Sequence, residues 1–352
     1  MKFGIIGLPQ SGKTTIFNAV TGGHTPTTAS AGRIDVHTAV VDVPDERVDR
    51  LAEIFKPKKV VHAKVTYADI AGLEGGSAKS GIAGPLLNQL SQMDGFIQVV
   101  RCFPDPNIPH PSGSVDPARD ISAMDSELLL NDLITVERKL ERLTDERKKG
   151  GTDRAVNERQ AALFTRLHET LSAEKPLRGL AFTPEEDKLL SGFGLLTRKP
   201  LLALLNLDEG QDAPVLDTSH PTFSIKGKLE MEIAQLPEED AAIFMQEYGI
   251  DELSLRKMIR LSYSLLELQS FFTFNNDEMR AWALRRGATA HEAAGQVHTD
   301  MQRGFVRAEV VHCQDLFDLG SMAEARASGK LRLEGKEYIV QDGEIVHIRF
   351  NV

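Results

Sequence analysis

The spacing of apolar residues divides the chain into three parts. Up to about residue 120, and again from about residue 194, short apolar runs alternate with polar stretches of helical period. The run at 200–205 is continuously apolar, which is typical of a strand buried on both faces. Strands that alternate with helices predict an α/β fold with a parallel sheet. We expect its strands near residues 2–6, 34–43, 60–69, 96–103, 200–205 and 222–226.

A heptad pattern interrupts this alternation after Asp120. A basic stretch with two glycines, residues 148–151, separates two arms that each carry an apolar seam. This predicts an antiparallel helical hairpin over 121–193. Its basic tip could contact nucleic-acid phosphates, or it could be only a solvated face. The predicted seam residues are Leu129, Leu133, Val136, Leu140 and Leu143 in the first arm, and Val156, Leu163, Leu167 and Leu171 in the second.

The last part of the chain changes from helical to strand-rich sequence. Helices are expected over 230–267, and strands at 271–274 and 279–284. A helix is expected over 289–301, and Asp342–Gly343 predicts the turn of a β-hairpin. The pattern therefore predicts three domains. They are an α/β domain (1–120 and 194–267), a helical insertion (121–193) and a C-terminal binding module (268–352).

Composition narrows the class of protein. The 352 residues carry a net charge of −10, which argues against DNA binding through overall charge. Cys102 and Cys313 are too few for a disulfide framework, and we expect a reducing, cytoplasmic environment. The amino terminus lacks the layout of a signal peptide, and no run reaches the roughly 20 apolar residues of a membrane span. We expect a monomer without a membrane partner.

The first expected strand leads into GLPQSGKTT, residues 7–15, which contains the P-loop pattern G-x-x-x-x-G-K-[ST]. The glycines let the backbone approach a phosphate, and successive N–H groups form an anion nest at the start of a helix. Lys13 supplies a positive charge for the β- and γ-phosphates, and Thr14 a hydroxyl ligand for Mg²⁺. The expected nucleotide-binding residues here are Gly7, Pro9, Gln10, Ser11, Gly12, Lys13, Thr14 and Thr15.

A second element of the phosphate site follows the strand at 60–69. That strand ends in D-x-x-G, Asp69 to Gly72. Downstream of a P-loop, we expect the Asp69 carboxylate to reach Mg²⁺ and the Gly72 N–H to contact the γ-phosphate, so that Gly72 and Lys13 both serve hydrolysis. Residues 74–84 are rich in glycine and serine and predict a loop. It could order around the γ-phosphate as a switch, or have no regulatory role.

A third element concerns the base. The strand at 200–205 ends in Asn206–Leu207–Asp208–Glu209, where GTPases usually read N-K-x-D. The Asp of that pattern accepts hydrogen bonds from guanine N1–H and the 2-amino group, and Glu209 stands in its place. Sites built on base hydrogen bonds discriminate strongly, so the change favours ATP over GTP, with Asn206 and Glu209 near the base. Alternatively, Asn206 only ends a strand and the acidic residues cap a turn.

With these motifs, the sequence resembles the YchF/Obg-like ATPase family over nearly its whole length. The most specific stretches are VPDERVDRLAEIFKPKK, DIAGL, VVRCF, RGFVRAEVV and LEGKEYIVQDGEIVHIRFNV, at 43–59, 69–73, 99–103, 303–311 and 333–352. The resemblance implies a Ras-like P-loop domain with a coiled-coil insertion and a β-grasp-like TGS domain. It also implies slow ATP hydrolysis and association with the ribosome, through rRNA or a ribosomal protein.

The resemblance implies roles for single residues as well. The catalytic Gln that usually follows D-x-x-G is an apolar residue in this family, here Leu73. A histidine in a loop beyond the next strand is implied to assist hydrolysis, and its counterpart is His110. Without the resemblance, a lone histidine in this Pro-rich loop would be taken for a solvated surface residue. Ser224 and Ile225 are implied to back the base through their main-chain N–H groups.

Two positions depart from the family pattern. The family commonly has Asn three places before the P-loop Lys, a feature linked to monovalent cations, whereas this chain has Gln10. A need for K⁺ is therefore an open question. The ungapped counterpart of the switch I Thr is Arg33, and Thr28 takes its place only with a shifted alignment. A Mg²⁺ ligand is therefore missing or relocated.

The expected function is a P-loop ATPase that acts as a slow switch, with ATP and Mg²⁺ as cofactors. Two alternatives remain at this point. One is a GTP-specific GTPase of the Obg type, which a comparison of ATP and GTP affinities would distinguish. The other is a scaffold that binds nucleotide without turnover, for which phosphate release would stay at background even with ribosomes present.

Overall fold

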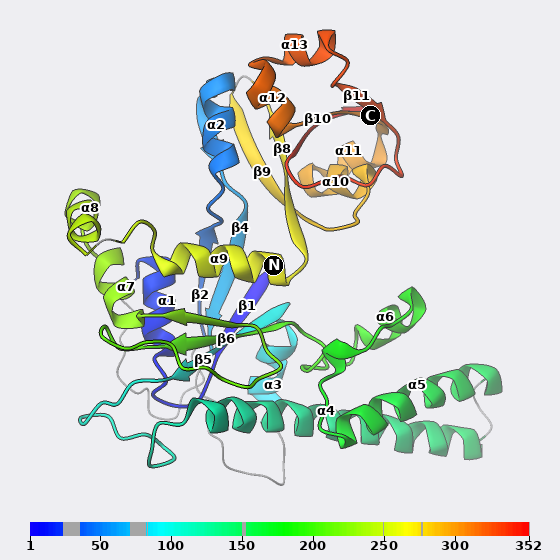
Figure 1. Cartoon of the computed structure of the whole chain (residues 1–352). Helices are drawn as coiled ribbons and strands as arrows, with labels where there is room; N and C mark the ends of the chain where they lie inside the picture. Colours follow the sequence, from blue (N-terminus) through cyan, green and yellow to red (C-terminus); the bar gives the residue numbers. More distant parts are fainter. Residues whose placement is uncertain are drawn as a thin grey trace. The chain divides into compact units, whose positions relative to one another are not determined.

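The computed structural model describes residues 1–23, 36–70, 82, 84–149, 153–248, 250–275 and 277–351. The chain forms two compact units (Figure 1). The first comprises Met1–Ala39 and Thr66–Leu255, and the second Val40–Val65 and Arg256–Val352. The predicted α/β domain included 40–65 and extended to residue 267, whereas the structure assigns 40–65 and 256–267 to the second unit.

The first sheet has the strand order β2-β4-β1-β5-β6-β7. The pairs β1–β4, β1–β5, β5–β6 and β6–β7 are all parallel, as the α/β pattern predicts. Every residue of β5 and β6 is buried, which explains the continuous apolar run of β6 and the mostly apolar sequence of β5, where Gln98 and Arg101 are the exceptions. The strands are β1 (Lys2–Ile6), β2 (His37–Asp42), β4 (Lys64–Asp69), β5 (Gly95–Arg101), β6 (Leu201–Asn206) and β7 (Thr222–Ile225).

Helices connect these strands, and the longest of them, α4, packs against the first unit with its first turns and forms part of the hairpin with its far half. Its first turns pack Ile121, Met124 and Leu128 into apolar clusters of the first unit. The predicted domain boundary at residue 121 therefore falls inside a helix. The helices of this part of the chain are α1 (Lys13–Thr21), α3 (Gly84–Ser91), α4 (Pro117–Lys149), α5 (Arg154–Ser172), α6 (Pro184–Leu190), α7 (Gly227–Ala234) and α8 (Glu238–Glu247). The next helix, α9 (Ser254–Leu265), belongs to the second unit from residue 256 onward.

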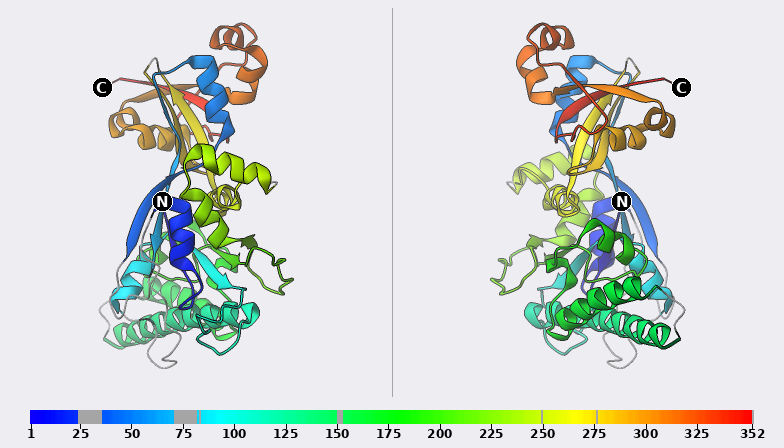
Figure 2. Two further views of the ribbon diagram at one scale, coloured as in Figure 1. Left: turned by 90° about the vertical axis from the view of Figure 1, so that its left-hand side faces the viewer. Right: turned by 90° about the vertical axis from the view of Figure 1, so that its right-hand side faces the viewer.

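The far half of α4 lies alongside α5 as the predicted hairpin (Figures 1 and 2). Val136, Leu143 and the α5 leucines at 163, 167 and 171 form a buried cluster. Phe164 of α5 also lies in this cluster and does not follow the predicted seam. Near the tip, Asn157 is buried, and its Nδ2 donates to the Leu143 carbonyl at 3.1 Å. The neighbouring Val156, a predicted seam residue, is only partly buried.

The second sheet has the order β11-β10-β12-β8-β9-β3. Its strands are β3 (Lys59–Val61), β8 (Leu268–Phe274), β9 (Glu278–Arg285), β10 (Phe305–His312), β11 (Arg332–Glu334) and β12 (Glu344–Phe350). β8 and β9 form the predicted antiparallel pair. Residues 40–65 belong here because β3 pairs with β9, and Arg47 of α2 (Glu46–Phe55) donates to Asp342 at 2.9 Å.

Two predictions for this unit are wrong. Asp342–Gly343 is a turn but not a hairpin turn, since β11 and β12 both pair with β10 instead of with each other. The Asp342 carboxylate instead accepts from the Ser270 N–H at 2.9 Å and from Arg47. The expected helix at 289–301 is two helices, α10 (Ala290–Val297) and α11 (Thr299–Arg303). His298 is extended between them, and its Nδ1 accepts from the Asp300 N–H.

The remaining helices of this unit are α12 (Cys313–Leu319) and α13 (Met322–Ala327). Among the described residues, no helix has both the length and the apolar character to span a bilayer.

Candidate functional site

The loop between β1 and α1 has a backbone that only glycine can form at two places. Gly7 has φ +151° and Gly12 has φ +94°. A Cβ on Gly7 would lie 2.5 Å from the Val99 carbonyl oxygen, and one on Gly12 would lie 2.3 Å from Asn206 Nδ2. Both conformation and space therefore exclude a side chain. The loop keeps the open, concave main chain that a phosphate nest requires.

Lys13 bends back over this loop. Its Nζ donates to the carbonyl oxygens of Gly7 at 3.2 Å and Leu8 at 2.8 Å. Burial lowers the pKa of Lys13 to about 8, and the nearby Asp69 carboxylate opposes this shift. The ammonium group is thus poorly solvated and lies directly at the nest. Phosphate oxygens would supply the negative charge that the loop itself lacks.

Thr14 and Asp69 meet beside the loop. The Thr14 hydroxyl donates to Asp69 Oδ2 at 2.8 Å, joining the start of α1 to the end of β4. Burial raises the pKa of Asp69, while the bond from Thr14 and the charge of Lys13 oppose the shift. Hydroxyl and carboxylate oxygens are the ligands that Mg²⁺ prefers. Several predicted partners lie outside the described residues, namely Thr28, Arg33, Gly72, Leu73 and all of 74–84 except Ile82 and Gly84.

Asn206 ties the end of β6 to the P-loop. Its Nδ2 donates to the Ser11 carbonyl at 3.1 Å, and its Oδ1 accepts from the Gly227 N–H at 3.2 Å. A Cβ on Gly227 would lie 2.6 Å from Asn206 Oδ1. The asparagine therefore bridges the phosphate loop and the start of α7. This favours a role in the site over the alternative that it merely ends a strand.

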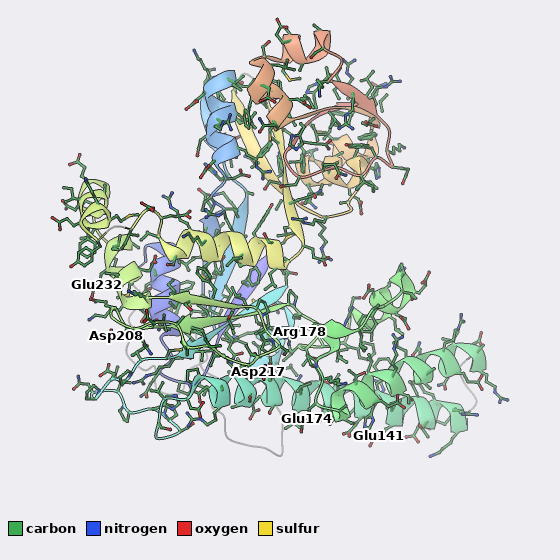
Figure 3. The ribbon with its side chains drawn as sticks, viewed as in Figure 1. Glu141, Glu174, Arg178, Asp208, Asp217 and Glu232 are labelled. Atoms are coloured by element: carbon green, nitrogen blue, oxygen red, sulfur yellow. The ribbon has the colours of Figure 1, made fainter. Side chains whose placement is uncertain are left out.

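Of the other residues in the predicted base motif, some are buried in the core and some are exposed to solvent. Leu207 is buried in a cluster with Val100 and Leu205, so its side chain offers no polar group. Glu209 is exposed, and its N–H donates to Asp208 Oδ1 at 3.0 Å (Asp208 is labelled in Figure 3). Ser224 and Ile225 lie on β7, in register with Leu205 and Asn206.

The remaining loop residues complete the cradle. Pro9 and Thr15 are partly buried, and Gln10 is exposed with φ +62°. Ser11 Oγ is buried and has no hydrogen-bond partner among the described residues. A free buried hydroxyl, a lysine at the nest and glycines with no room for a Cβ fit a polyphosphate, and the oxygens of Thr14 and Asp69 fit its Mg²⁺.

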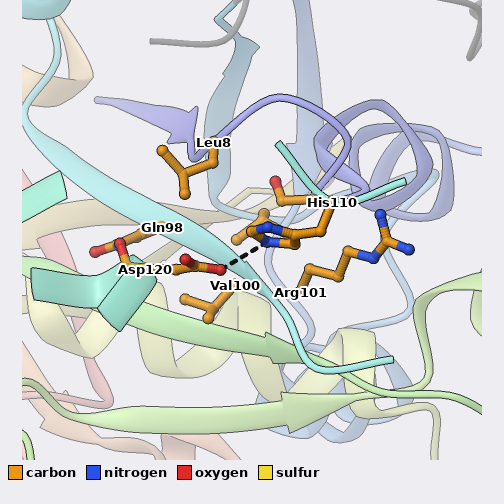
Figure 4. Close-up of a pocket in the computed structure, with 8 residues that line it drawn as sticks. Leu8, Gln98, Val100, Arg101, His110 and Asp120 are labelled. Carbon is orange, nitrogen blue, oxygen red and sulfur yellow. Dashed lines mark hydrogen bonds and ion pairs between the residues drawn. The ribbon is translucent and has the colours of Figure 1, made fainter. Parts of the chain in front are cut away.

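His110 is not a solvated surface residue. Its side chain is 4% exposed, and Nε2 lies 2.8 Å from Asp120 Oδ2 (Figure 4). Its Nδ1 accepts from the Ser112 N–H at 3.1 Å. The imidazole lines a small cavity with Leu8 and Ser11 of the P-loop, with room for about one water molecule. The structure therefore brings His110 next to the predicted phosphate loop.

Sequence reasoning missed two residues that shape this region. Arg101 ends β5, and its guanidinium donates to the carbonyls of Phe103 at 3.0 Å and Ile108 at 2.9 Å, which fixes the loop before His110. A charged residue at the end of a mostly apolar strand was the available signal. Asp120, the partner of His110, had no comparable signal, because an acidic residue in the first turn of a helix is ordinary.

The pKa of Lys13 predicts a pH dependence of nucleotide binding. Only the protonated lysine attracts phosphate, and a bound polyphosphate raises its pKa above about 8. Affinity should therefore be highest below pH 8 and fall about tenfold between pH 7 and pH 9. Titration calorimetry in two buffers of different ionisation enthalpy should detect proton uptake on binding at pH 8.5. Constant affinity with no proton uptake would contradict this role of Lys13.

Comparisons with known proteins cover the whole chain. A family model described as 50S ribosome-binding GTPase matches residues 2–139. A second, named for the C-terminal part of the YchF GTPase and described as a protein of unknown function (DUF933), matches 268–351.

Curated relatives and a solved structure agree with these matches. The chain is 41% identical to the ribosome-binding ATPase YchF of Bacillus subtilis, with 99% of both chains covered. It is 38% identical to the protein of the same name from Escherichia coli O157:H7, with 100% of this chain and 99% of the relative covered. The solved YchF GTPase of Schizosaccharomyces pombe superposes with a TM-score of 0.82 at 33% identity, covering 99% of this chain and 97% of that one.

Proposed function

Because the chain belongs to the YchF family of ribosome-binding ATPases, we propose that it binds ATP with Mg²⁺ and hydrolyses it slowly as a switch on the ribosome. The observation that carries this proposal is the convergence of Lys13, Thr14 and Asp69 on a loop that has no room for a Cβ at Gly7 or Gly12. Only a compact anion with an associated cation would use all of these groups at once.

Each group has a distinct part in this proposal. Main-chain N–H groups of the loop between β1 and α1 hold the phosphates, except at Pro9, which has no N–H. Lys13 exchanges its two carbonyl acceptors for phosphate oxygens. Thr14 and Asp69 hold Mg²⁺, which when bound neutralises the charge that develops on the phosphates. His110 orients water or offsets charge near the γ-phosphate. Gly72 is proposed to contact the γ-phosphate through its N–H. Whether K⁺ takes part in the site depends on whether Gln10 can replace the asparagine that the family commonly has at this position.

The base preference rests on the end of β6. Asn206 is used by the P-loop, and Leu207 is buried in the core, so neither offers the polar contacts of the N-K-x-D pattern. Glu209 is one methylene longer than the Asp that selects guanine. We therefore propose ATP as the preferred nucleotide, with Ser224 and Ile225 behind the base. The names of the similar proteins include both ATPase and GTPase, so this choice needs a direct test.

Restoring the guanine-selecting residues should change the base preference. The double variant Leu207→Lys/Glu209→Asp is expected to raise GTP affinity relative to ATP by about tenfold or more. Glu209→Asp alone should give part of the change without disturbing the buried Leu207. Asp208→Asn, at the exposed neighbour, serves as control. An unchanged ratio of the two dissociation constants in the folded double variant would exclude this site as the determinant of base choice.

Association with the ribosome is proposed from the names of the relatives and from the charge of the hairpin. The last turn of α4 carries Arg147, Lys148 and Lys149, and Arg154 at the start of α5 is 80% exposed. These side chains suit rRNA phosphates, although a ribosomal protein is also a possible partner. Co-sedimentation with ribosomes at rising salt tests the proposal, because contacts to phosphate weaken steeply as salt increases. No co-sedimentation at low salt, with any nucleotide, would contradict it.

The other parts of the chain also have proposed roles. We propose that the hairpin formed by the far half of α4 and by α5 is a coiled-coil insertion, and that 268–352 is a TGS domain without catalytic groups of its own. Cys102 and Cys313 are both free and buried, which supports a cytoplasmic location. We propose a monomer, which light scattering of the full chain would test.

A further inference from the structure

Both ring nitrogens of His110 are in use. Nδ1 accepts a hydrogen bond from the Ser112 N–H, so in the neutral ring the proton is on Nε2 and is donated to Asp120 Oδ2 at 2.8 Å. Arg119 Nη2 also lies 3.5 Å from Nδ1. In this arrangement the imidazole has no nitrogen left to orient a water or to meet a phosphate. A ring that takes part in hydrolysis must first leave Asp120.

We infer that Asp120 is a positioning residue that holds His110 in a resting place beside the P-loop, and that release of His110 from Asp120 limits hydrolysis. This inference rests on the proposed role of His110 in ATP hydrolysis and adds a control to it. Asp120 itself does not touch the nucleotide in this scheme. It sets the fraction of molecules in which the imidazole is free.

Release of His110 does not leave a buried charge unpaired. The other carboxylate oxygen, Asp120 Oδ1, accepts from Arg119 Nε at 3.0 Å and Nη2 at 2.8 Å. Arg119 is held in turn by the Ser114 carbonyl at 2.7 Å and the Ser114 hydroxyl at 3.2 Å. An unpaired buried carboxylate would be prohibitively costly. The Arg119 contact therefore makes the His110 bond the one that can break.

The surroundings of the imidazole also include polar groups without partners. Three of the residues that line the cavity beside His110 carry buried polar atoms with no partner among the described residues, Ser11 Oγ, Gln98 Oε1 and Arg101 Nη1. One water molecule fits this cavity and can bond to polar atoms there, whereas the larger imidazole ring does not fit and a released ring moves elsewhere. Since Arg101 anchors the loop at Phe103 and Ile108, movement can be confined to the residues after Ile108.

A second pair on α4 provides a matched control. His220 Nε2 lies 2.6 Å from Asp125 Oδ2, and Arg178 Nη1 lies 3.1 Å from His220 Nδ1. As in the first pair, a histidine Nε2 meets a carboxylate of α4, but here the arginine contacts the histidine instead of the carboxylate, and the Asp125 side chain is 27% exposed against 5% for Asp120. However, the residues that line the cavity at the P-loop do not include His220 or Asp125. Weakening this pair removes a histidine–carboxylate contact from α4 without freeing a histidine near the nucleotide.

The test compares Asp120→Asn with Asp125→Asn in the full chain, with ATP turnover measured at saturating ATP and Mg²⁺. Asp120→Asn should raise kcat about tenfold, the factor that one charge-assisted hydrogen bond typically supplies. Asp125→Asn should leave kcat unchanged, and adding His110→Ala to Asp120→Asn should abolish the gain. An unchanged or lower kcat in folded Asp120→Asn, or a gain that persists without His110, would overturn the inference.

A second readout follows the imidazole itself. In nucleotide-free protein, ring ¹⁵N spectra should show His110 as the Nε2–H tautomer, and Asp120→Asn should increase its reaction with diethyl pyrocarbonate. Unchanged reactivity would overturn the inference even if kcat rose. If His110→Ala abolishes turnover but Asp120→Asn does not raise it, only the positioning role fails. If wild-type protein releases no phosphate from ATP, the proposed function fails instead.

Discussion

Replacing Lys13 with alanine is expected to lower ATP affinity by at least about 100-fold. The substitution removes the buried ammonium at the nest and its charge-assisted bonds to phosphate, each worth about 1.5–3 kcal/mol. The variant should stay folded, because burial already disfavours the charged form of Lys13 and lowers its pKa to about 8. Calorimetric titration with ATP and Mg²⁺ measures the loss, and circular dichroism checks the fold.

Lys199 is the matched control for this experiment. Its Nζ donates to the carbonyls of Leu90, Ser91 and Met93, at 2.9, 2.6 and 2.5 Å, and burial lowers its pKa to about 8 as well. Lys199→Ala should cost about 1–3 kcal/mol of stability, because these carbonyls lose their donor, yet leave ATP affinity unchanged. Equal losses of affinity in both variants would mean that Lys13 acts only through stability.

Gly12→Ala should remove nucleotide binding and destabilise the first unit. The new Cβ would lie 2.3 Å from Asn206 Nδ2, and φ +94° is unfavourable for alanine. Asn206 would have to move and lose its bond to the Ser11 carbonyl. Strain and the lost bond together predict about 3 kcal/mol of destabilisation and at least about a 100-fold loss of ATP affinity. Urea unfolding and calorimetry measure the two effects.

Gly22→Ala separates backbone strain from the loss of the cradle. Gly22 ends α1 with φ +61°, and the nearest atom to its Cβ would be the Ala234 carbonyl oxygen at 3.9 Å. The variant should lose only about 1 kcal/mol and keep its ATP affinity. If Gly12→Ala bound ATP as tightly as Gly22→Ala, close approach of the backbone to phosphate would not be the reason for glycine at position 12.

Local patterns were sufficient for the hairpin and for most of the first sheet, but the single strand expected at 60–69 is two strands, β3 and β4, in different sheets. The apolar residues of β5 and β6 and of the seam from Leu129 to Leu143 are the residues that become wholly or partly buried. The spacing of these residues in the sequence was therefore enough to predict these elements. The assignment of 40–65 depended on the pairing of β3 with β9, more than 200 residues apart in sequence. No local pattern encodes such a pairing. The prediction of a hairpin turn at Asp342–Gly343 was wrong for a similar reason. The Asp342 carboxylate accepts hydrogen bonds from Arg47 and Ser270, which are distant in sequence.

The candidate site was predictable to the extent that it lies in continuous motifs. The P-loop and the Asp69 motif meet where the Thr14 hydroxyl donates to Asp69, consistent with the expectation that a D-x-x-G at the end of a strand downstream of a P-loop belongs to the same site. The bridge that Asn206 forms between Ser11 of the P-loop and Gly227 of α7 could be inferred only in part, since Gly227 belongs to no motif. The His110–Asp120 pair depends on how the loop after β5 folds back on α4. Burial of His110 therefore could not be read from a Pro-rich loop sequence.

The base preference is the central claim, and one measurement tests it most directly. Calorimetric titration of the nucleotide-free chain with ATP, ADP, GTP and GDP, in the presence of Mg²⁺ and with or without K⁺, gives the affinities side by side. The account predicts tighter binding of ATP and ADP than of GTP and GDP under both salt conditions. Tighter binding of the guanine nucleotides would contradict it.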